Sequence, residues 1–135
     1  MSSYLTTKDE IIKFWIESSD ENYKDMIALY SSERYSFALF TGHLVIEKLL
    51  KALYVKNVAI DVPKIHNLLI LADKIGLKLT KKQVNVLKDI NAFNIAARYN
   101  DAKLNFYIKC TKEYTGKNIE IIEEFRKWLK EKIMQ

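Results

Sequence analysis

The sequence has very few of the residues that interrupt helices or cross-link a chain. Its 135 residues include three glycines, one proline and one cysteine. Folds built from hairpins and tight turns need more glycine and proline than this, so long uninterrupted helices are expected. The single Cys110 excludes an intramolecular disulfide and any zinc site built from several cysteines. It also favours a reducing compartment, and we therefore expect a cytoplasmic protein.

Long apolar runs are also absent. No run approaches the roughly 18 residues that cross a membrane as a helix. The first residues, MSSYLTTKDEIIKFW, become charged at position eight and contain no apolar signal core. The composition, 49% hydrophobic and 29% charged, is that of a globular protein rather than a disordered one. We expect one domain over residues 1–135, large enough to form a core without metals or disulfides.

The positive charge is concentrated in the second half of the chain. The net charge is +5, but residues 1–61 hold seven Lys/Arg against nine Asp/Glu, and residues 62–135 hold fifteen against eight. A basic half is compatible with nucleic acid, a phosphate-bearing ligand or an acidic protein surface. The alternative is a lysine-rich surface that only maintains solubility. Nineteen lysines against three arginines favour this alternative, because phosphate and base recognition use more arginine.

Apolar residues recur at helical spacing and predict about five helices, at residues 8–30, 33–56, 65–75, 80–97 and 117–134. A capping box at Thr7 predicts the first start, and Gly76 predicts the end of the third helix. Thr115 and Gly116 are expected to open the last helix, after a short apolar segment at residues 104–108. Gly42, inside the second helix, indicates close packing of a neighbouring helix. The predicted fold is all-α, an up-and-down bundle.

One face of the second helix carries ionisable side chains at one-turn spacing. Phe40, His43, Glu47, Lys51 and Tyr54 fall within about 60° of one another on a helical wheel. A carboxylate between an imidazole and an ammonium can hold a histidine charged or fix its tautomer, which suits proton transfer or phosphate binding. One alternative is a surface ladder of ion pairs, worth a few tenths of a kcal/mol each. A second alternative is a helix-packing or dimer surface, because aromatic residues stand at both ends.

Two further polar clusters stand at predicted helix ends. His66 follows Pro63 at the start of the third helix, where it serves either as a ligand-binding residue or as a partner of free backbone groups. Arg98, Tyr99 and Asp101 follow the fourth helix and are able to bind phosphate and stack a base, or to close a salt bridge between Arg98 and Asp101. Two histidines without paired cysteines do not form a zinc site, so neither a metal nor a cofactor is expected.

A series of short motifs extends over residues 5–133. In chain order they are Trp15 and Asp25, Arg34-Tyr35, His43, Glu47-Lys48-x-x-Lys51-Ala52, Pro63-Lys64-Ile65-His66-Asn67-Leu68, and Ala97-Arg98-Tyr99. Their order and spacing resemble the HEPN domain (higher eukaryotes and prokaryotes nucleotide-binding). The resemblance implies an up-and-down helical bundle that usually forms homodimers. It also implies a minimal nucleotidyltransferase encoded beside it, in a toxin–antitoxin or related two-component system.

Many HEPN proteins are metal-independent ribonucleases that use an arginine followed, after four to six residues, by a histidine. This chain departs from that pattern, because the three positions after Arg98 at which the motif would place its histidine hold Lys103, Leu104 and Asn105. No histidine follows Arg34 or Arg126 at this spacing either. RNA cleavage through the 2′-OH needs a base near neutral pKa and a cation for the developing charge. Arg98 would supply the cation, but the base is missing from the motif.

The sequence therefore predicts a non-catalytic HEPN-type domain that binds a nucleotide, RNA or a partner minimal nucleotidyltransferase, and that forms a homodimer. The alternatives are a metal-independent endoribonuclease toxin and a purely structural dimerisation module. The candidate ligand- or nucleotide-binding residues are His43, Glu47, Lys51, His66, Arg98, Tyr99 and Asp101.

Overall fold

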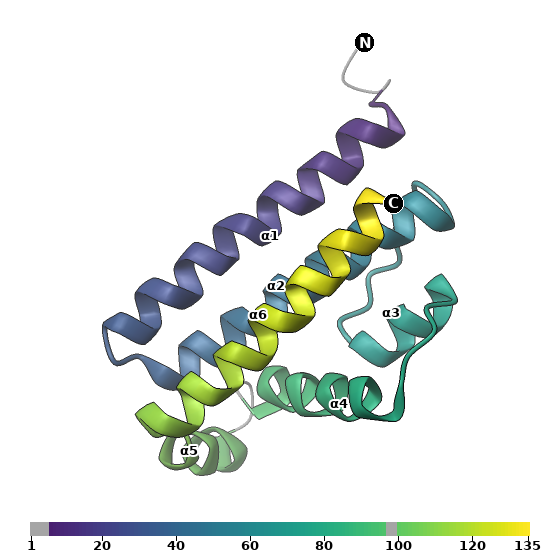
Figure 1. Cartoon of the computed structure of the whole chain (residues 1–135). Coiled ribbons are helices and arrows are strands. Elements are labelled where there is room, and N and C mark those ends of the chain that lie inside the picture. The colour runs from purple at the N-terminus through teal and green to yellow at the C-terminus, as the bar shows by residue number, and fades with distance from the viewer. Residues whose placement is uncertain (1–5, 97–99) are drawn as a thin grey trace.

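The computed structural model describes residues 6–96 and 100–135, and these residues form six α-helices and no strand (Figure 1). The helices are α1 (Lys8–Ser31), α2 (Tyr35–Asn57), α3 (Leu68–Ile75), α4 (Lys81–Ala96), α5 (Asn100–Lys109) and α6 (Lys112–Met134). The prediction of an all-α bundle is confirmed. The short apolar segment after the fourth predicted helix forms a helix of its own, α5.

Three long helices lie side by side, and α2 is the central one (Figure 1). It contacts α1, α3, α4, α5 and α6, whereas α1 and α6 have few direct contacts. The short helices α3, α4 and α5 return the chain from the end of α2 to the start of α6. As a result α6 runs parallel to α2 and antiparallel to α1. Consistent with this, Lys56 near the end of α2 donates to the carbonyl oxygen of Ile133 at 2.7 Å.

Local capping chemistry sets several helix ends where the sequence predicted them. The Thr7 hydroxyl accepts from the backbone N–H of Glu10 at 3.1 Å, and the Glu10 carboxylate accepts from the N–H of Thr7 in return. Gly76 ends α3 in the left-handed conformation, with φ of 76°. Both ends follow from short-range hydrogen bonding and glycine's freedom at positive φ.

Two predicted helix starts are wrong. The last helix begins at Lys112, because the hydroxyl of Thr111 accepts from the N–H of Tyr114 and caps the helix one turn earlier than expected. Thr115, expected from the sequence to precede and open the helix, is completely buried inside α6. The third helix begins at Leu68 rather than at residue 65, because the Asn67 side chain accepts from two backbone N–H groups and acts as the N-cap.

The core is built around α2. The side chains of Leu39, Ile46, Leu49, Leu50 and Leu53 are almost completely buried there. The prediction that a neighbouring helix packs closely on Gly42 is confirmed, because a Cβ at this position would lie 2.5 Å from Cδ1 of Ile122 on α6. Among the described residues, no helix has the combination of length and apolar character that a membrane span requires.

Side-chain contacts join α1 to α6 where their backbones do not pack closely. Asp20 on α1 accepts from Arg126 at 3.1 Å and from Lys130 at 2.7 Å, both on α6. The guanidinium of Arg126 also stacks on the Tyr23 ring, 3.9 Å from its centroid. Partial burial raises the pKa of Asp20, but Lys130 and Arg126 outweigh it and hold that pKa below its usual value. This network connects the two outer helices of the bundle, α1 and α6.

Candidate functional site

The polar stripe predicted on α2 lies inside the protein. His43 is completely buried, Glu47 is 4% exposed and Lys51 is 7% exposed. The alternative of a surface ladder of ion pairs is therefore wrong. Interior charges cost free energy unless they are paired and hydrogen-bonded, so such residues are kept for a structural or functional reason.

Glu47 is the centre of this buried cluster. Its Oε2 accepts from the ammonium of Lys51 at 2.9 Å, and its Oε1 lies 3.1 Å from Nδ1 of His66. Nδ1 of His43 lies 3.6 Å from the same Oε1. Three nitrogen-bearing side chains thus surround one carboxylate, and Lys51 balances its charge. We call these four residues, His43, Glu47, Lys51 and His66, the Glu47 cluster.

The partners of the two imidazoles define which ring nitrogens carry protons. Nε2 of His43 lies 3.0 Å from the backbone carbonyl oxygen of His66, and a carbonyl only accepts, so this nitrogen is protonated. Nδ1 of His66 faces the carboxylate of Glu47 and donates to it. In the neutral ring, Nε2 of His66 is then the basic nitrogen. A carboxylate that accepts from Nδ1 in this way fixes the tautomer and the orientation of the imidazole ring.

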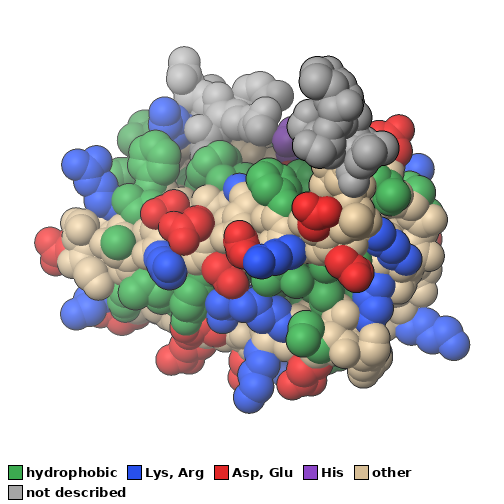
Figure 2. Space-filling view, turned by 90° about the horizontal axis from the view of Figure 1, so that it is seen from above, with side chains coloured by type: hydrophobic (Ala, Val, Ile, Leu, Met, Phe, Trp, Pro, Cys, Tyr) green, Lys and Arg blue, Asp and Glu red, His purple; other side chains and the backbone are tan. Residues whose placement is uncertain are grey.

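His66 is the member of the cluster that reaches solvent. Its side chain is 56% exposed, whereas the side chain of His43 is 1% exposed. Of the chain's two histidines, it is therefore the one visible on the face shown in Figure 2. Any ligand that contacts the Glu47 cluster from outside meets this imidazole first.

Two elements hold the backbone around His66. On one side, His43 and Glu47 of α2 bind its carbonyl oxygen and its ring. On the other side, Asn91 of α4 accepts from the N–H of Leu68 at 2.8 Å and donates to the Asn67 side chain at 3.0 Å. The segment before α3 is thereby tied to α2 and α4 at once. The alternative that His66 binds free backbone groups does not describe its side chain, because the ring faces the carboxylate of Glu47, and the backbone carbonyl of His66 is instead bound by His43.

The beginning of α3 does not form an anion site. Asn91 takes the N–H of Leu68, and the Asn67 side chain takes those of Leu69 and Ile70. Because these first donors of the helix already have acceptors within the protein, they are not directed at a ligand. The chemistry on this side of the molecule therefore belongs to the imidazole of His66.

The ammonium of Lys51 makes its contacts inside the protein. It binds Glu47 and lies over the ring of Trp15 on α1, 5.3 Å from the ring centroid. Through these contacts Lys51 holds the carboxylate of Glu47 in place. The neighbouring Lys48 is half-buried, and burial lowers its pKa below the ordinary value although Glu47 opposes the shift.

Four of the seven predicted site residues are brought together by the fold, namely the Glu47 cluster. Arg98 and Tyr99 lie outside the described residues. Asp101 lies in α5, but its side chain is outside the described part of the structure as well. Within residues 6–96 and 100–135, no group of three or more His, Cys, Asp and Glu side chains has an arrangement able to hold a metal ion.

The sequence did not predict that Trp15 and Asn91 support the site. Trp15 is one of the family-motif residues but not one of the predicted site residues, and in the structure its ring covers Lys51. Asn91 connects α4 to the segment that carries His66. An asparagine on a helix gives no indication of so distant a partner, so no local pattern would have identified Asn91.

The molecule is thus an all-α bundle with a buried carboxylate cluster that reaches the surface through one histidine. A family model for the HEPN domain matches residues 12–133, so this chain belongs to the HEPN domain family. The comparison with curated proteins gave no match, and neither did the comparison with solved structures. The resemblance drawn from the sequence motifs is confirmed.

Proposed function

We propose that this HEPN domain is a non-catalytic binding module that takes up a phosphate-bearing ligand, a nucleotide or an RNA, at the exposed face of His66. The observation that carries the proposal is a half-exposed imidazole held in one orientation by a buried carboxylate. A fixed imidazole contributes a directed hydrogen bond at little entropic cost, which favours a specific contact. The excess of positive charge in residues 62–135 supports an anionic ligand.

Binding of labelled single-stranded RNA and of ATP to two single variants tests this proposal. His66→Ala removes the imidazole, and we expect it to weaken binding by about tenfold, the effect of losing one hydrogen bond to a charged group. Lys64→Ala is the matched control, because it removes an exposed cation two residues away. We expect Lys64→Ala to have a smaller effect that disappears at high salt. Equal losses in both variants would mean that binding is only general charge attraction.

We further propose that the module works in the cytoplasm as a homodimer, in a toxin–antitoxin-like pair with a minimal nucleotidyltransferase. Membership of the HEPN family supports this partner class. Co-expression with a nucleotidyltransferase encoded next to it, followed by light scattering of the purified material, tests both parts. If the purified protein is a monomer and does not bind the neighbouring nucleotidyltransferase, this part of the proposal is wrong.

The second candidate function is a metal-independent endoribonuclease, and the pairing of Glu47 with His66 favours it. In this reaction Nε2 of His66 takes the proton of a 2′-OH, whose oxygen attacks the adjacent phosphorus. The bond from phosphorus to the 5′-oxygen breaks, this oxygen takes a proton from water and leaves as a 5′-hydroxyl, and a 2′,3′-cyclic phosphate remains. Cleavage of RNA in the presence of a chelator, lost in His66→Ala and retained in Lys64→Ala, would establish it. Intact RNA after incubation with the wild-type protein would exclude it.

A further inference from the structure

A cavity of about 860 Å³ opens between the beginning of α2 and α5, on a part of the surface built by residues other than the Glu47 cluster. We call it the α2–α5 groove, and the residues that matter in it are Arg34, Phe37, Lys103, Leu104, Tyr107 and Ile108. Arg34 comes from the turn between α1 and α2, Phe37 from the first turn of α2, and the other four from α5.

The walls of the groove are apolar side chains that the fold leaves uncovered. Leu104, Tyr107 and Ile108 are 62%, 69% and 66% exposed, and Phe37 is 56% exposed. The three α5 residues stand at positions i, i+3 and i+4 and therefore form one stripe along the helix. The opposite side of α5 holds it to the core, because Phe106 is buried and stacks on Phe93 at 5.6 Å. The outward stripe is not needed for packing, and such a patch is typical of a protein interaction site.

The shape and composition fit a helix better than a small ligand. An amphipathic helix lying in an apolar groove places its own i, i+3 and i+4 side chains against the walls. Phenylalanine, tyrosine and arginine are enriched at the centres of protein interfaces, and aromatic and arginine side chains often dominate their binding energy. Phe37, Tyr107 and Arg34 bring these residue types into one cavity.

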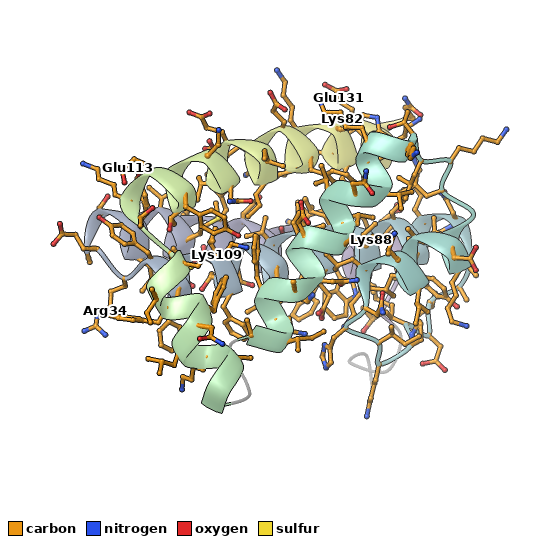
Figure 3. All side chains as sticks on the ribbon, turned by 90° about the horizontal axis from the view of Figure 1, so that it is seen from below. Arg34, Lys82, Lys88, Lys109, Glu113 and Glu131 are labelled. Carbon is orange, nitrogen blue, oxygen red and sulfur yellow. The ribbon has the colours of Figure 1, made fainter. Side chains whose placement is uncertain are left out.

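The charges around the groove decide what kind of helix it accepts. Arg34 points outward beside α5 (Figure 3), and neither Arg34 nor Lys103 pairs with a carboxylate among the described residues. The charged residues of the turn, of α5 and of the first turn of α6 are Glu33, Arg34, Asp101, Lys103, Lys109, Lys112 and Glu113, four cations against three acidic residues, so the excess positive charge is that of Arg34 and Lys103, unpaired within the described part of the chain. A second copy of this chain, packed by two-fold symmetry on the same surface, would face these cations with their own equivalents. An acidic partner is attracted instead.

We propose that the α2–α5 groove docks an acidic amphipathic helix of a partner protein. Apolar side chains of that helix contact Phe37, Leu104, Tyr107 and Ile108, and its carboxylates pair with Arg34 and Lys103. This proposal is independent of the ligand proposed for His66, since the two surfaces share no residue.

Two designed peptides of about 18 residues, or five helical turns, test the charge and shape requirements together. Both carry leucines at one-turn spacing on one face, with glutamates elsewhere in the first peptide and lysines in the second. Fluorescence anisotropy of the labelled peptides gives the Kd values. We expect the acidic peptide to bind the wild-type protein at least about tenfold more tightly than the basic one at low salt. Comparable affinities for the two peptides would overturn the proposal.

Three variants locate the binding. Tyr107→Ser/Ile108→Ser is expected to weaken the acidic peptide by at least about tenfold, and Arg34→Glu/Lys103→Glu to reverse the preference between the peptides. Phe14→Ser is the matched control, because Phe14 is also an exposed aromatic side chain, 60% exposed, but lies on α1 away from the groove. The altered groove side chains are exposed, and a circular dichroism melt verifies that each variant is folded.

The remaining outcomes also decide the question. If Tyr107→Ser/Ile108→Ser still binds the acidic peptide, the peptide binds elsewhere on the protein, and the proposal is overturned. A wild-type dimer that Tyr107→Ser/Ile108→Ser converts to a monomer in sedimentation would assign the groove to a second copy of the chain. His66→Ala is expected to bind the acidic peptide as tightly as the wild type does. The proposal for the α2–α5 groove and the proposal for His66 are therefore tested independently.

Discussion

Nδ1 of His66 lies 3.1 Å from Oε1 of Glu47, which is 19 positions earlier in the chain and almost entirely buried. The imidazole is half-exposed, so one contact joins the surface of the molecule to a charge in its interior. Because Lys51 balances the same carboxylate from the inside, a change at Glu47 affects both the orientation of His66 and the stability of the bundle.

Glu47→Gln is predicted to destabilise the protein strongly. The amide has nearly the shape of the carboxylate but no charge, so the ammonium of Lys51 is left in the interior without a counterion. Removing one partner of a buried ion pair costs about 3 kcal/mol or more, and we expect a loss of this order in the free energy of unfolding. Urea denaturation followed by circular dichroism measures it.

Glu17→Gln is the matched control for this change. Glu17 pairs with Lys13 at 3.7 Å, also at one-turn spacing, but their side chains are 64% and 75% exposed. Because water screens this pair, the stability is expected to change little. Similar losses in Glu17→Gln and Glu47→Gln would show that burial does not strengthen the Glu47 pair.

Features set by neighbouring residues were predictable from the sequence, and features set by distant contacts were not. The capping box at Thr7 and the left-handed Gly76 depend on hydrogen bonds within one turn, and both predictions are confirmed. The start of α6 required a choice between Thr111 and Thr115, which have similar local chemistry. Thr115 is completely buried within α6, and burial is set by the packing of the whole bundle, which the local sequence pattern does not contain.

The candidate site shows the same division. A helical wheel placed His43, Glu47 and Lys51 on one face of α2, and the structure confirms that they share it. The wheel does not say what covers that face. Trp15 of α1 and the segment that ends at His66 come from elsewhere in the chain, and they turn an apparent surface ladder into a buried cluster.

Gly42→Ala is predicted to destabilise the bundle. The added Cβ would lie 2.5 Å from Cδ1 of Ile122 and 3.1 Å from Sδ of Met26, both in the core. Overpacking of this kind costs roughly 1–3 kcal/mol, whereas the higher helix propensity of alanine relative to glycine contributes about 1 kcal/mol in the opposite direction. We expect a net loss of about 1 kcal/mol in the free energy of unfolding, measured by urea denaturation.

Ile122→Val provides the companion to this variant, because it removes the Cδ1 methyl group that a Cβ at position 42 would meet. The double variant is expected to lose less stability than the sum of the two single losses, since residues in contact couple. Strict additivity would contradict the proposed clash, as would a Gly42→Ala variant more stable than the wild type.

Glu33→Gly is predicted to stabilise the turn between α1 and α2. Glu33 has φ of 61°, and the N–H groups of Glu33 and Arg34 bind the carbonyl oxygens of Tyr30 and Leu29 at the end of α1. The same arrangement ends α3, where glycine occupies the left-handed position. Because a side chain at positive φ costs roughly 1 kcal/mol, the variant should raise the Tm.

Gly76→Ala is the reciprocal change and should lower the Tm, since Gly76 has φ of 76° with no neighbour that a Cβ would strike. Thermal denaturation of both variants under one set of conditions gives the comparison. If Glu33→Gly lowers the Tm, the side chain of Glu33 stabilises the turn by more than its positive φ costs.

Cys110→Ala is predicted to change how stability depends on pH above neutrality. Burial raises the pKa of the Cys110 thiol from its ordinary value of 9.0 to about 11. Between these two values the unfolded chain loses the thiol proton and the folded protein keeps it, so the folded state binds more protons. The free energy of unfolding must therefore fall as the pH rises through this window. The alanine variant lacks this contribution.

Urea denaturation of the wild type and of Cys110→Ala, at several pH values from about 8 to 11, isolates the effect of this thiol. Tyrosines and lysines titrate in the same range in both proteins, so their contributions cancel in the difference. We expect the stability of the wild type relative to the variant to be constant below pH 9 and to decline above it, because only the wild type carries the thiol. A relative stability independent of pH would mean that the thiol ionises equally readily in the folded and unfolded states.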